Sequence, residues 1–162
     1  MSRISSHEYF MRMAETAAER STCLRRKVGA VLVKDNHIIS TGYNGSPVGI
    51  PNCCDVGTCM RTSKGIPSGT NLDIDYAVHA EQNAIIQCAV HGNTTPGATM
   101  YVTHQPCIEC TRMIINAGIK CIVYKEDYPN AEFAESLLMQ AGVQLWKYER
   151  LMKNLADMDW KS

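Results

Sequence analysis

Apolar positions recur at helical spacing at the start of the chain and then change to a strand pattern. In residues 5–21 the apolar side chains repeat every three or four positions, which predicts an amphipathic helix. Residues 27–44, "KVGAVLVKDNHIISTGYN", contain two apolar runs on either side of Asp35 and Asn36. Because Asp and Asn suit tight two-residue turns, this segment predicts a β-hairpin.

The next segment, residues 43–76, has little periodicity and is rich in Gly, Pro, Ser, Asn and Asp. It is predicted to be one long ordered loop or an insertion. Loops of this length inside a compact domain are usually functional.

From residue 79 onward, helical and strand patterns alternate. The predicted helices cover residues 79–91, 107–118 and 131–141, and the predicted strands cover residues 98–104, 120–124 and 143–148. Such alternation favours an α/β layer structure with a partly parallel sheet. The tail after Tyr148 can form a short amphipathic helix that packs on a neighbour. Without a repeat or linker, residues 1–162 are expected to form a single domain.

Composition narrows the class of protein. Sixteen basic and sixteen acidic side chains cancel, which disfavours a general nucleic-acid binder. No apolar run approaches the length of a membrane span, and the N-terminal segment lacks a secretory pattern, so a cytoplasmic location without a membrane is expected. In a chain of this kind, eight cysteines indicate metal ligation rather than disulfides.

Two short motifs could together form a metal site. His79 begins one predicted helix, and Cys107 and Cys110 follow Pro106 at the start of another. Helix N-termini favour negative charge, so the two thiols could be held there as thiolates. One imidazole and two thiolates on Zn²⁺ leave one tetrahedral position open, which is typical of a catalytic site.

Glu81 lies two residues after His79, roughly 200° round an ideal helix, so it is a poor fourth ligand from the same face. It can instead reach a water at the open position. A carboxylate there acts first as a general base and then as a general acid, which is the apparatus of a hydrolase.

Each half of this pattern has a simpler interpretation. Cys107 and Cys110 could form a redox pair, and His79 could only cap its helix. A redox pair, however, has no need of the His-x-Glu element upstream. The combination is therefore more specific than either half.

The motifs His79-Ala-Glu81 and Pro106-Cys107-Ile-Glu-Cys110 resemble the signature of zinc-dependent nucleobase deaminases. Within that group the chain most resembles deoxycytidylate (dCMP) deaminases. The resemblance lies in "KVGAVLV", "STGYNGSPVGIPNCC", "GIPSG", "GATMYVTHQPCIEC" and "GIKCIVYKEDYP". It covers about residues 20–145, and "GYNGSP" is the element that narrows it to the dCMP branch.

The resemblance implies a cytidine-deaminase-like three-layer fold, in which a five-stranded mixed sheet is flanked by helices. It implies hydrolytic deamination of dCMP to dUMP and ammonia, which supplies dUMP for thymidylate synthesis. His79, Cys107 and Cys110 carry over as the zinc ligands. Glu81 carries over as the group that protonates N3 of the pyrimidine and then the departing amine.

Further residues carry over as substrate contacts. Asn44 matches an asparagine that hydrogen-bonds the sugar, although beside Gly45 it also suits a simple turn. Arg26 and Lys27 belong to the densest basic run, which suits a 5′-phosphate or merely a solvated edge. Tyr128 matches a tyrosine near the substrate phosphate.

The resemblance also implies regulation and assembly. Relatives are commonly homohexamers that are activated by dCTP, with Mg²⁺ accompanying the triphosphate, and inhibited by dTTP. "GYNGSP" lies beside their effector site, so Gly42, Tyr43, Gly45 and Ser46 are predicted effector contacts.

Four other cysteines could form a second metal site. Cys23, Cys53, Cys54 and Cys59 lie in or near the long loop and could hold a structural Zn²⁺, as in some relatives. They could equally be ordinary thiols of a polar loop. Cys88 lies on an apolar helix face and is predicted to be a small buried hydrophobe.

Two other classes of function are compatible with the zinc motif. A deaminase of tRNA adenosine or of a free nucleoside would share the zinc motif, but zero net charge and the acidic residues 126–135 argue against tRNA. A zinc-stabilised binding protein without activity would have no use for Glu81 at an open metal site.

Overall fold

Five strands form one mixed sheet in the order β2-β1-β3-β4-β5. The computed structural model describes residues 3–67, 70–71, 74 and 76–159. The elements are α1 (Ser6–Glu19), β1 (Gly29–Lys34), β2 (His37–Tyr43), α2 (Cys53–Val56), α3 (Met60–Ser63), α4 (Ala80–His91), β3 (Thr99–His104), α5 (Ile108–Asn116), β4 (Cys121–Glu126), α6 (Glu132–Gln140), β5 (Gln144–Lys147) and α7 (Tyr148–Asp159).

The strand directions match the predicted pattern of a hairpin followed by strand–helix alternation. β1 runs antiparallel to β2 and to β3. β4 runs parallel to β3, and β5 runs parallel to β4. Because parallel neighbours need a crossover, α5 and α6 connect these three strands. The prediction of a five-stranded mixed sheet flanked by helices is confirmed.

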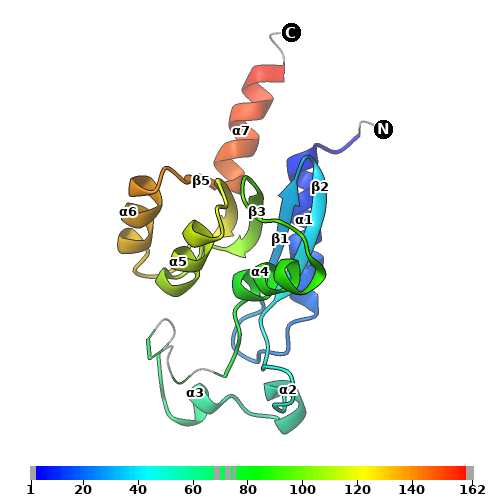
Figure 1. Cartoon of the computed structure of the whole chain (residues 1–162). Coiled ribbons are helices and arrows are strands. Elements are labelled where there is room, and N and C mark those ends of the chain that lie inside the picture. Colours follow the sequence, from blue (N-terminus) through cyan, green and yellow to red (C-terminus); the bar gives the residue numbers. More distant parts are fainter. Residues whose placement is uncertain (1–2, 68–69, 72–73, 75, 160–162) are drawn as a thin grey trace.

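The sheet is covered on both faces, and the alternation of β1 shows why (Figure 1). Ala30 and Leu32 belong to the core cluster formed with α4, α5 and α6. Val31 and Val33 belong to the opposite cluster, formed with α1 and the start of α7. Successive side chains of a strand point to opposite faces, so one strand contributes to both layers of core. The fold therefore has three layers.

Local turn chemistry fixes several element ends as predicted. Asp35 and Asn36, the two residues between β1 and β2, both have positive φ, of 48° and 63°. Positive φ at both central positions is the requirement of the turn that matches strand twist in a two-residue hairpin. Gly92 ends α4 in the left-handed conformation, with φ 74°.

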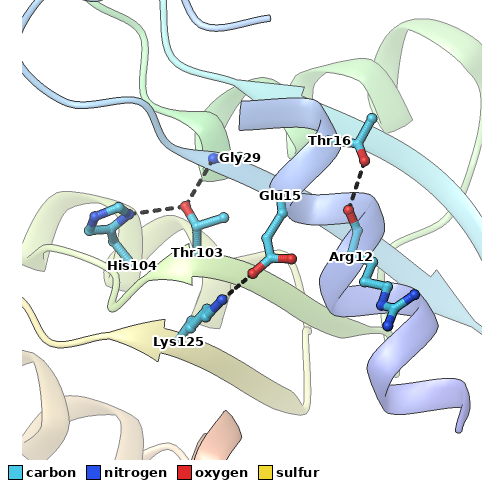
Figure 2. Close-up of polar contacts among 7 residues, drawn as sticks. All are labelled: Arg12, Glu15, Thr16, Gly29, Thr103, His104 and Lys125. Atoms are coloured by element: carbon cyan, nitrogen blue, oxygen red, sulfur yellow. Dashed lines mark hydrogen bonds and ion pairs between the residues drawn. The ribbon is translucent and has the colours of Figure 1, made fainter. Parts of the chain in front are cut away.

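An ion pair and a short helix complete the α1 side of the sheet. Lys125 of β4 pairs with Glu15 of α1 (Figure 2). Tyr148 and Leu151 of α7 pack on the α1 cluster. The predicted amphipathic tail is thus a helix that packs on this chain's own core. No helix in the described ranges combines the length and the apolar character that crossing a bilayer requires.

The long loop is more structured than its composition suggested. It contains the single-turn helices α2 and α3, and Gly45 forms an isolated antiparallel bridge with Val78. A four-residue helix is too short to produce a detectable period. The bridge closes the loop on itself, so its two ends meet beside the N-terminus of α4.

Gly42 allows β2 to pack directly on α4, and its substitution should be costly. A Cβ at this position would lie 2.1 Å from Ala80 O and 2.5 Å from Ala84 N, both backbone atoms. Because neither atom can move without displacing the helix, we expect Gly42→Ala to reduce the free energy of unfolding by about 3 kcal/mol. Urea denaturation followed by circular dichroism measures this loss.

Gly49→Ala is the matched control. Gly49 has a positive φ of 88°, but no atom lies within 4 Å of a Cβ built there. Only backbone strain of about 1 kcal/mol is therefore expected. Equal losses in the two variants would contradict the packing explanation.

Candidate active site

Two helix N-termini bring the metal-binding motifs together. His79 is the N-cap residue of α4, and Cys107 is the N-cap residue of α5. Cys110 lies in the first turn of α5 and is fully buried. Both N-caps have extended backbone, which turns the side chains back toward the helix start. The predicted convergence of the two helices is therefore present.

The three side chains have the spacing of a tetrahedral metal site. His79 Nδ1 lies 3.5 Å from Cys107 Sγ and 3.3 Å from Cys110 Sγ. Zn–N and Zn–S bonds at a tetrahedral angle would separate such atoms by about 3.6 Å. Within the described residues this is the one group of three or more His, Cys, Asp or Glu whose ligand atoms lie within 4.8 Å of one another. A nitrogen and two sulfur donors in a buried site fit Zn²⁺.

The pKa values of the two thiols favour binding of a cation. A hydrogen bond from Cys110 is the main cause that lowers the pKa of Cys107 to about 4. The same hydrogen bond raises the pKa of Cys110 well above its ordinary value. Cys107 is therefore the thiol that ionises first, and a bound Zn²⁺ would favour loss of the proton that Cys110 retains.

Glu81 lies in the first turn of α4 and is only 4% exposed. Burial is the main cause that raises its pKa from 4.5 to about 7, against the opposing effect of His79. A bound cation would lower this pKa again. Glu81 lines the same pocket as His79 and Cys107, so its carboxyl group can exchange protons with a molecule held there.

Basic side chains also line this pocket. Arg25, Arg26 and Tyr128 line it, and the guanidinium carbon of Arg26 lies 5.6 Å from the centre of the Tyr128 ring. This distance is within the range of a cation–π contact, which holds Arg26 in place. Lys27 is exposed and is not among the lining residues. Its neighbours Arg26 and Val28 do line the pocket.

Asn44 lines the pocket and is 7% exposed. Its Nδ2 donates to Arg26 O at 2.8 Å, and its Oδ1 accepts from Val28 N at 2.9 Å and from Ser21 Oγ at 2.6 Å. Its φ is not positive, so a left-handed turn does not explain it. The amide fixes the backbone that carries Arg26, and the second Nδ2 hydrogen is left for a ligand.

Three further pocket residues were given no role in the sequence prediction. Arg61 comes from the long loop and is 6% exposed, with its guanidinium donating to Pro67 O and Thr70 O. His104 and Gln105 directly follow the buried part of β3. Polar residues at the carboxyl end of a buried strand are a recognisable signal of a ligand site, which could have identified these two.

The four residues predicted to contact an effector line a second cavity. Gly42, Tyr43, Gly45 and Ser46 face it between β2, the following loop and α4. Gly45 and Ser46 also line the first pocket, so the two cavities share a wall. Gly42 packs closely against the backbone of α4. This packing is enough to explain why a glycine occupies the position.

The four cysteines of the predicted second zinc site, all in described parts of the chain, do not form a cluster of sulfur atoms. Cys23, Cys53 and Cys59 line the first pocket, whereas Cys54 is exposed and does not. No three of these four bring their sulfur atoms within 4.8 Å of one another, all four being described. The described residues thus give a second zinc site no support. Cys88 is 1% exposed, as predicted.

The chain is similar to named deaminases over most of its length. Residues 4–126 match the family model described as the cytidine and deoxycytidylate deaminase zinc-binding region. The chain is 45% identical over 151 residues to ComE operon protein 2 of Bacillus subtilis (strain 168), covering 92% of this chain and 74% of that protein. It is 43% identical over 135 residues to the deoxycytidylate deaminase of Mycobacterium phage D29, covering 78% of this chain and 99% of that protein.

Among solved structures, the chain resembles the dCMP deaminase of the cyanophage S-TIM5 in complex with dCMP and dUMP. The TM-score is 0.73 at 32% sequence identity, and the match covers 90% of this chain and 98% of that chain. Motif, fold and sequence similarity agree over the same residues. The chain therefore belongs to the cytidine and deoxycytidylate deaminase family.

Proposed function

We propose that the chain is a hydrolase that deaminates dCMP to dUMP and ammonia and so supplies dUMP for thymidylate synthesis. The observation that carries this proposal is a single pocket that is lined both by the metal-binding cluster with buried Glu81 and by Arg25, Arg26 and Tyr128. A cytosine nucleotide has a deaminable ring at one end and a phosphate at the other. The named relatives support the same substrate.

Zn²⁺ held by His79, Cys107 and Cys110 would supply Lewis-acid activation of a water molecule. Glu81 accepts a proton from that water and delivers it to N3 as oxygen adds to C4 of the ring. Glu81 then takes the second proton from the new C4 hydroxyl and transfers it to the exocyclic nitrogen, and the C4–N bond breaks to leave a C4 carbonyl and ammonia. Glu81 is buried in the first turn of α4, so its carboxyl group is held in one place for both proton transfers.

The basic residues of the pocket select a nucleotide. Arg26 is oriented by the Tyr128 ring and by the Asn44 hydrogen bond to its carbonyl oxygen. Its planar guanidinium can bind two phosphate oxygens at once. The remaining Nδ2 hydrogen of Asn44 is available to a sugar hydroxyl.

The test is ammonia release from the purified zinc-loaded protein with dCMP, deoxycytidine and dCTP as parallel substrates. Turnover is expected with dCMP and is expected to be far slower with the other two. Faster turnover of deoxycytidine than of dCMP would contradict the nucleotide assignment. One bound zinc per chain with no turnover of any of the three would contradict the function.

Arg26→Leu should separate phosphate binding from chemistry. A charge-assisted hydrogen bond is worth about 1.5–3 kcal/mol, so kcat/KM for dCMP is expected to fall by roughly 10- to 100-fold, mainly through KM. Initial rates over a range of dCMP concentrations measure this. Lys27→Leu is the matched control, because this neighbouring cation does not line the pocket. Equal losses in both variants would mean that only the general positive charge of the segment matters.

The second cavity is the proposed effector site. It is lined by Gly42, Tyr43, Gly45 and Ser46, and the proposed ligands are dCTP with Mg²⁺ as activator and dTTP as inhibitor. Gly45 and Ser46 also line the substrate pocket, so a ligand in one cavity can alter the other through this shared wall. Turnover of dCMP should rise with dCTP and Mg²⁺ and fall with dTTP. A rate that neither nucleotide changes would contradict this regulation.

A homohexamer is proposed as the assembly. Apolar side chains lie exposed along the rim of the second cavity and on α4 beside it: Tyr43, Val48, Ile50, Ile86 and Val90. An exposed apolar patch of this kind is typical of a surface that is covered in an assembly. Light scattering of the purified protein should give the mass of six 18.0 kDa chains. The mass of a single chain would contradict the proposal.

A further inference from the structure

We propose that Thr103 is a positioning residue that holds His104 in its Nε2–H tautomer, so that His104 presents an uncharged donor to the phosphate of bound dCMP. The identity of the ligand rests on the proposed function. The tautomer, in contrast, depends on the protein alone. Thr103 and His104 are the last two residues of β3, shortly before the zinc ligand Cys107.

The hydroxyl of Thr103 joins two groups (Figure 2). The backbone N–H of Gly29 donates to Thr103 Oγ1 at 3.1 Å. Thr103 Oγ1 also lies 3.0 Å from His104 Nδ1. Thr103 is only 6% exposed, so its hydroxyl cannot rely on solvent for a missing partner.

These contacts decide which ring nitrogen carries the proton. Since a backbone N–H can only donate, Thr103 Oγ1 is the acceptor toward Gly29. Its own hydrogen needs an acceptor, and among its partners in the described structure His104 Nδ1 is the one that can accept. Nδ1 is then unprotonated. A neutral imidazole has one N–H, so the proton lies on Nε2.

The surroundings of His104 agree with an uncharged ring. Burial is the main cause that lowers its pKa, and the nearby Arg26 lowers it further. Glu126, the residue paired with His104 in the parallel register of β3 and β4, has the opposite effect and does not reverse the shift. The ring is therefore neutral at neutral pH.

His104 lines the pocket together with Arg26 and Tyr128. A phosphate bound by Arg26 has three non-ester oxygens, and one guanidinium leaves part of that acceptor capacity unused. An uncharged N–H donor next to Arg26 adds a hydrogen bond without placing a second positive charge against the first. Thr103 acts only through His104, because its hydroxyl faces Gly29 and the ring.

The tautomer is measured directly by long-range ¹H–¹⁵N correlation spectra of the zinc-loaded protein, with His104→Leu assigning the ring signals. The wild type is expected to show an unprotonated Nδ1 and a protonated Nε2. Thr103→Val, which keeps the shape and removes the hydroxyl, is expected to show both tautomers. Thr103→Ser, which keeps the hydroxyl, is expected to restore the wild-type pattern. A protonated Nδ1 in the wild type would overturn the inference.

The ligand contact is measured by the ratio of kcat/KM for dCMP to kcat/KM for deoxycytidine. Loss of one hydrogen bond to a charged acceptor should lower this ratio by about 10- to 100-fold in His104→Leu. Thr103→Val should lower it by about 3- to 10-fold, and Thr103→Ser should keep it within about twofold of the wild type. His104→Gln, which retains a terminal N–H donor, should recover part of the loss.

An unchanged ratio in His104→Leu would overturn the phosphate contact, as would equal losses with both substrates, which would place His104 at the sugar or the base. Melting temperatures of all variants identify any loss that comes from unfolding. If the wild type did not turn over dCMP, the proposed function would fail, but the spectra would still decide the tautomer. The two failures are therefore distinguishable.

Discussion

Glu81→Gln is expected to reduce kcat for dCMP by about 10³- to 10⁴-fold while zinc remains bound at one ion per chain. The amide has nearly the shape of the carboxyl group, but it can neither accept a proton from water nor return one to the ring. Glu81 is not one of the three clustered ligands, so the metal site is left intact. Ammonia release and zinc analysis of the same preparation measure the two effects.

Stability separates a catalytic role for Glu81 from a structural one. Burial raises the pKa of Glu81 to about 7, which means that the folded protein holds its charged form at a cost. A neutral glutamine avoids that cost, so the melting temperature of the metal-free variant should be no lower than that of the metal-free wild type. A marked decrease would indicate that Glu81 mainly supports the fold.

Glu109→Gln is the matched control for chemistry. Glu109 lies between the two ligand cysteines in the chain, but its side chain is 52% exposed and pairs with Arg112. Its loss should leave kcat within about twofold of the wild type, because a surface ion pair contributes at most about 1 kcal/mol. Similar losses in the two variants would indicate a nonspecific effect of charge near the zinc.

The parts of this molecule that could be predicted from sequence are those that local physics determines. The hairpin turn at Asp35 and Asn36 and the end of α4 at Gly92 depend on the backbone preferences of two or three residues. The metal site could be predicted for a related reason. His79 and Cys107 each begin a helix, and the chemistry of the two motifs required that the helix starts meet.

The parts that could not be predicted depend on contacts between distant segments. Arg61 reaches the pocket because the long loop folds back through the bridge between Gly45 and Val78, and no periodicity in residues 43–76 indicated this. Arg26 and Lys27 of the basic run were predicted to contact the substrate, but the sequence did not indicate that Arg25 lines the pocket and Lys27 does not. The orientation of this segment depends on Asn44. Its side-chain amide hydrogen-bonds to Arg26 O and Val28 N and so fixes the backbone of residues 26–28.

Cys110→Ser is expected to lower bound zinc from one ion per chain to less than about 0.1 and to reduce deamination of dCMP by more than about 10³-fold. Serine keeps the shape, but its hydroxyl is a harder donor that stays protonated where a thiol ionises. Cys110 is fully buried, and its sulfur lies 3.3 Å from His79 Nδ1, so the substitution removes one of the three clustered donors. Metal analysis after gel filtration and ammonia release measure the two losses.

Cys88→Ser is the matched control, since it places the same hydroxyl in an equally buried position. Cys88 is 1% exposed on α4, in the same core cluster, but it is not one of the clustered ligands. Its substitution should reduce the free energy of unfolding by about 1–2 kcal/mol, the cost of a buried hydroxyl, and should leave zinc content and kcat unchanged. Full zinc content in Cys110→Ser, or zinc loss in both variants, would contradict the assignment of the cluster. Because both cysteines are buried in the same core cluster and only Cys110 is a clustered ligand, the difference between the variants measures the metal site.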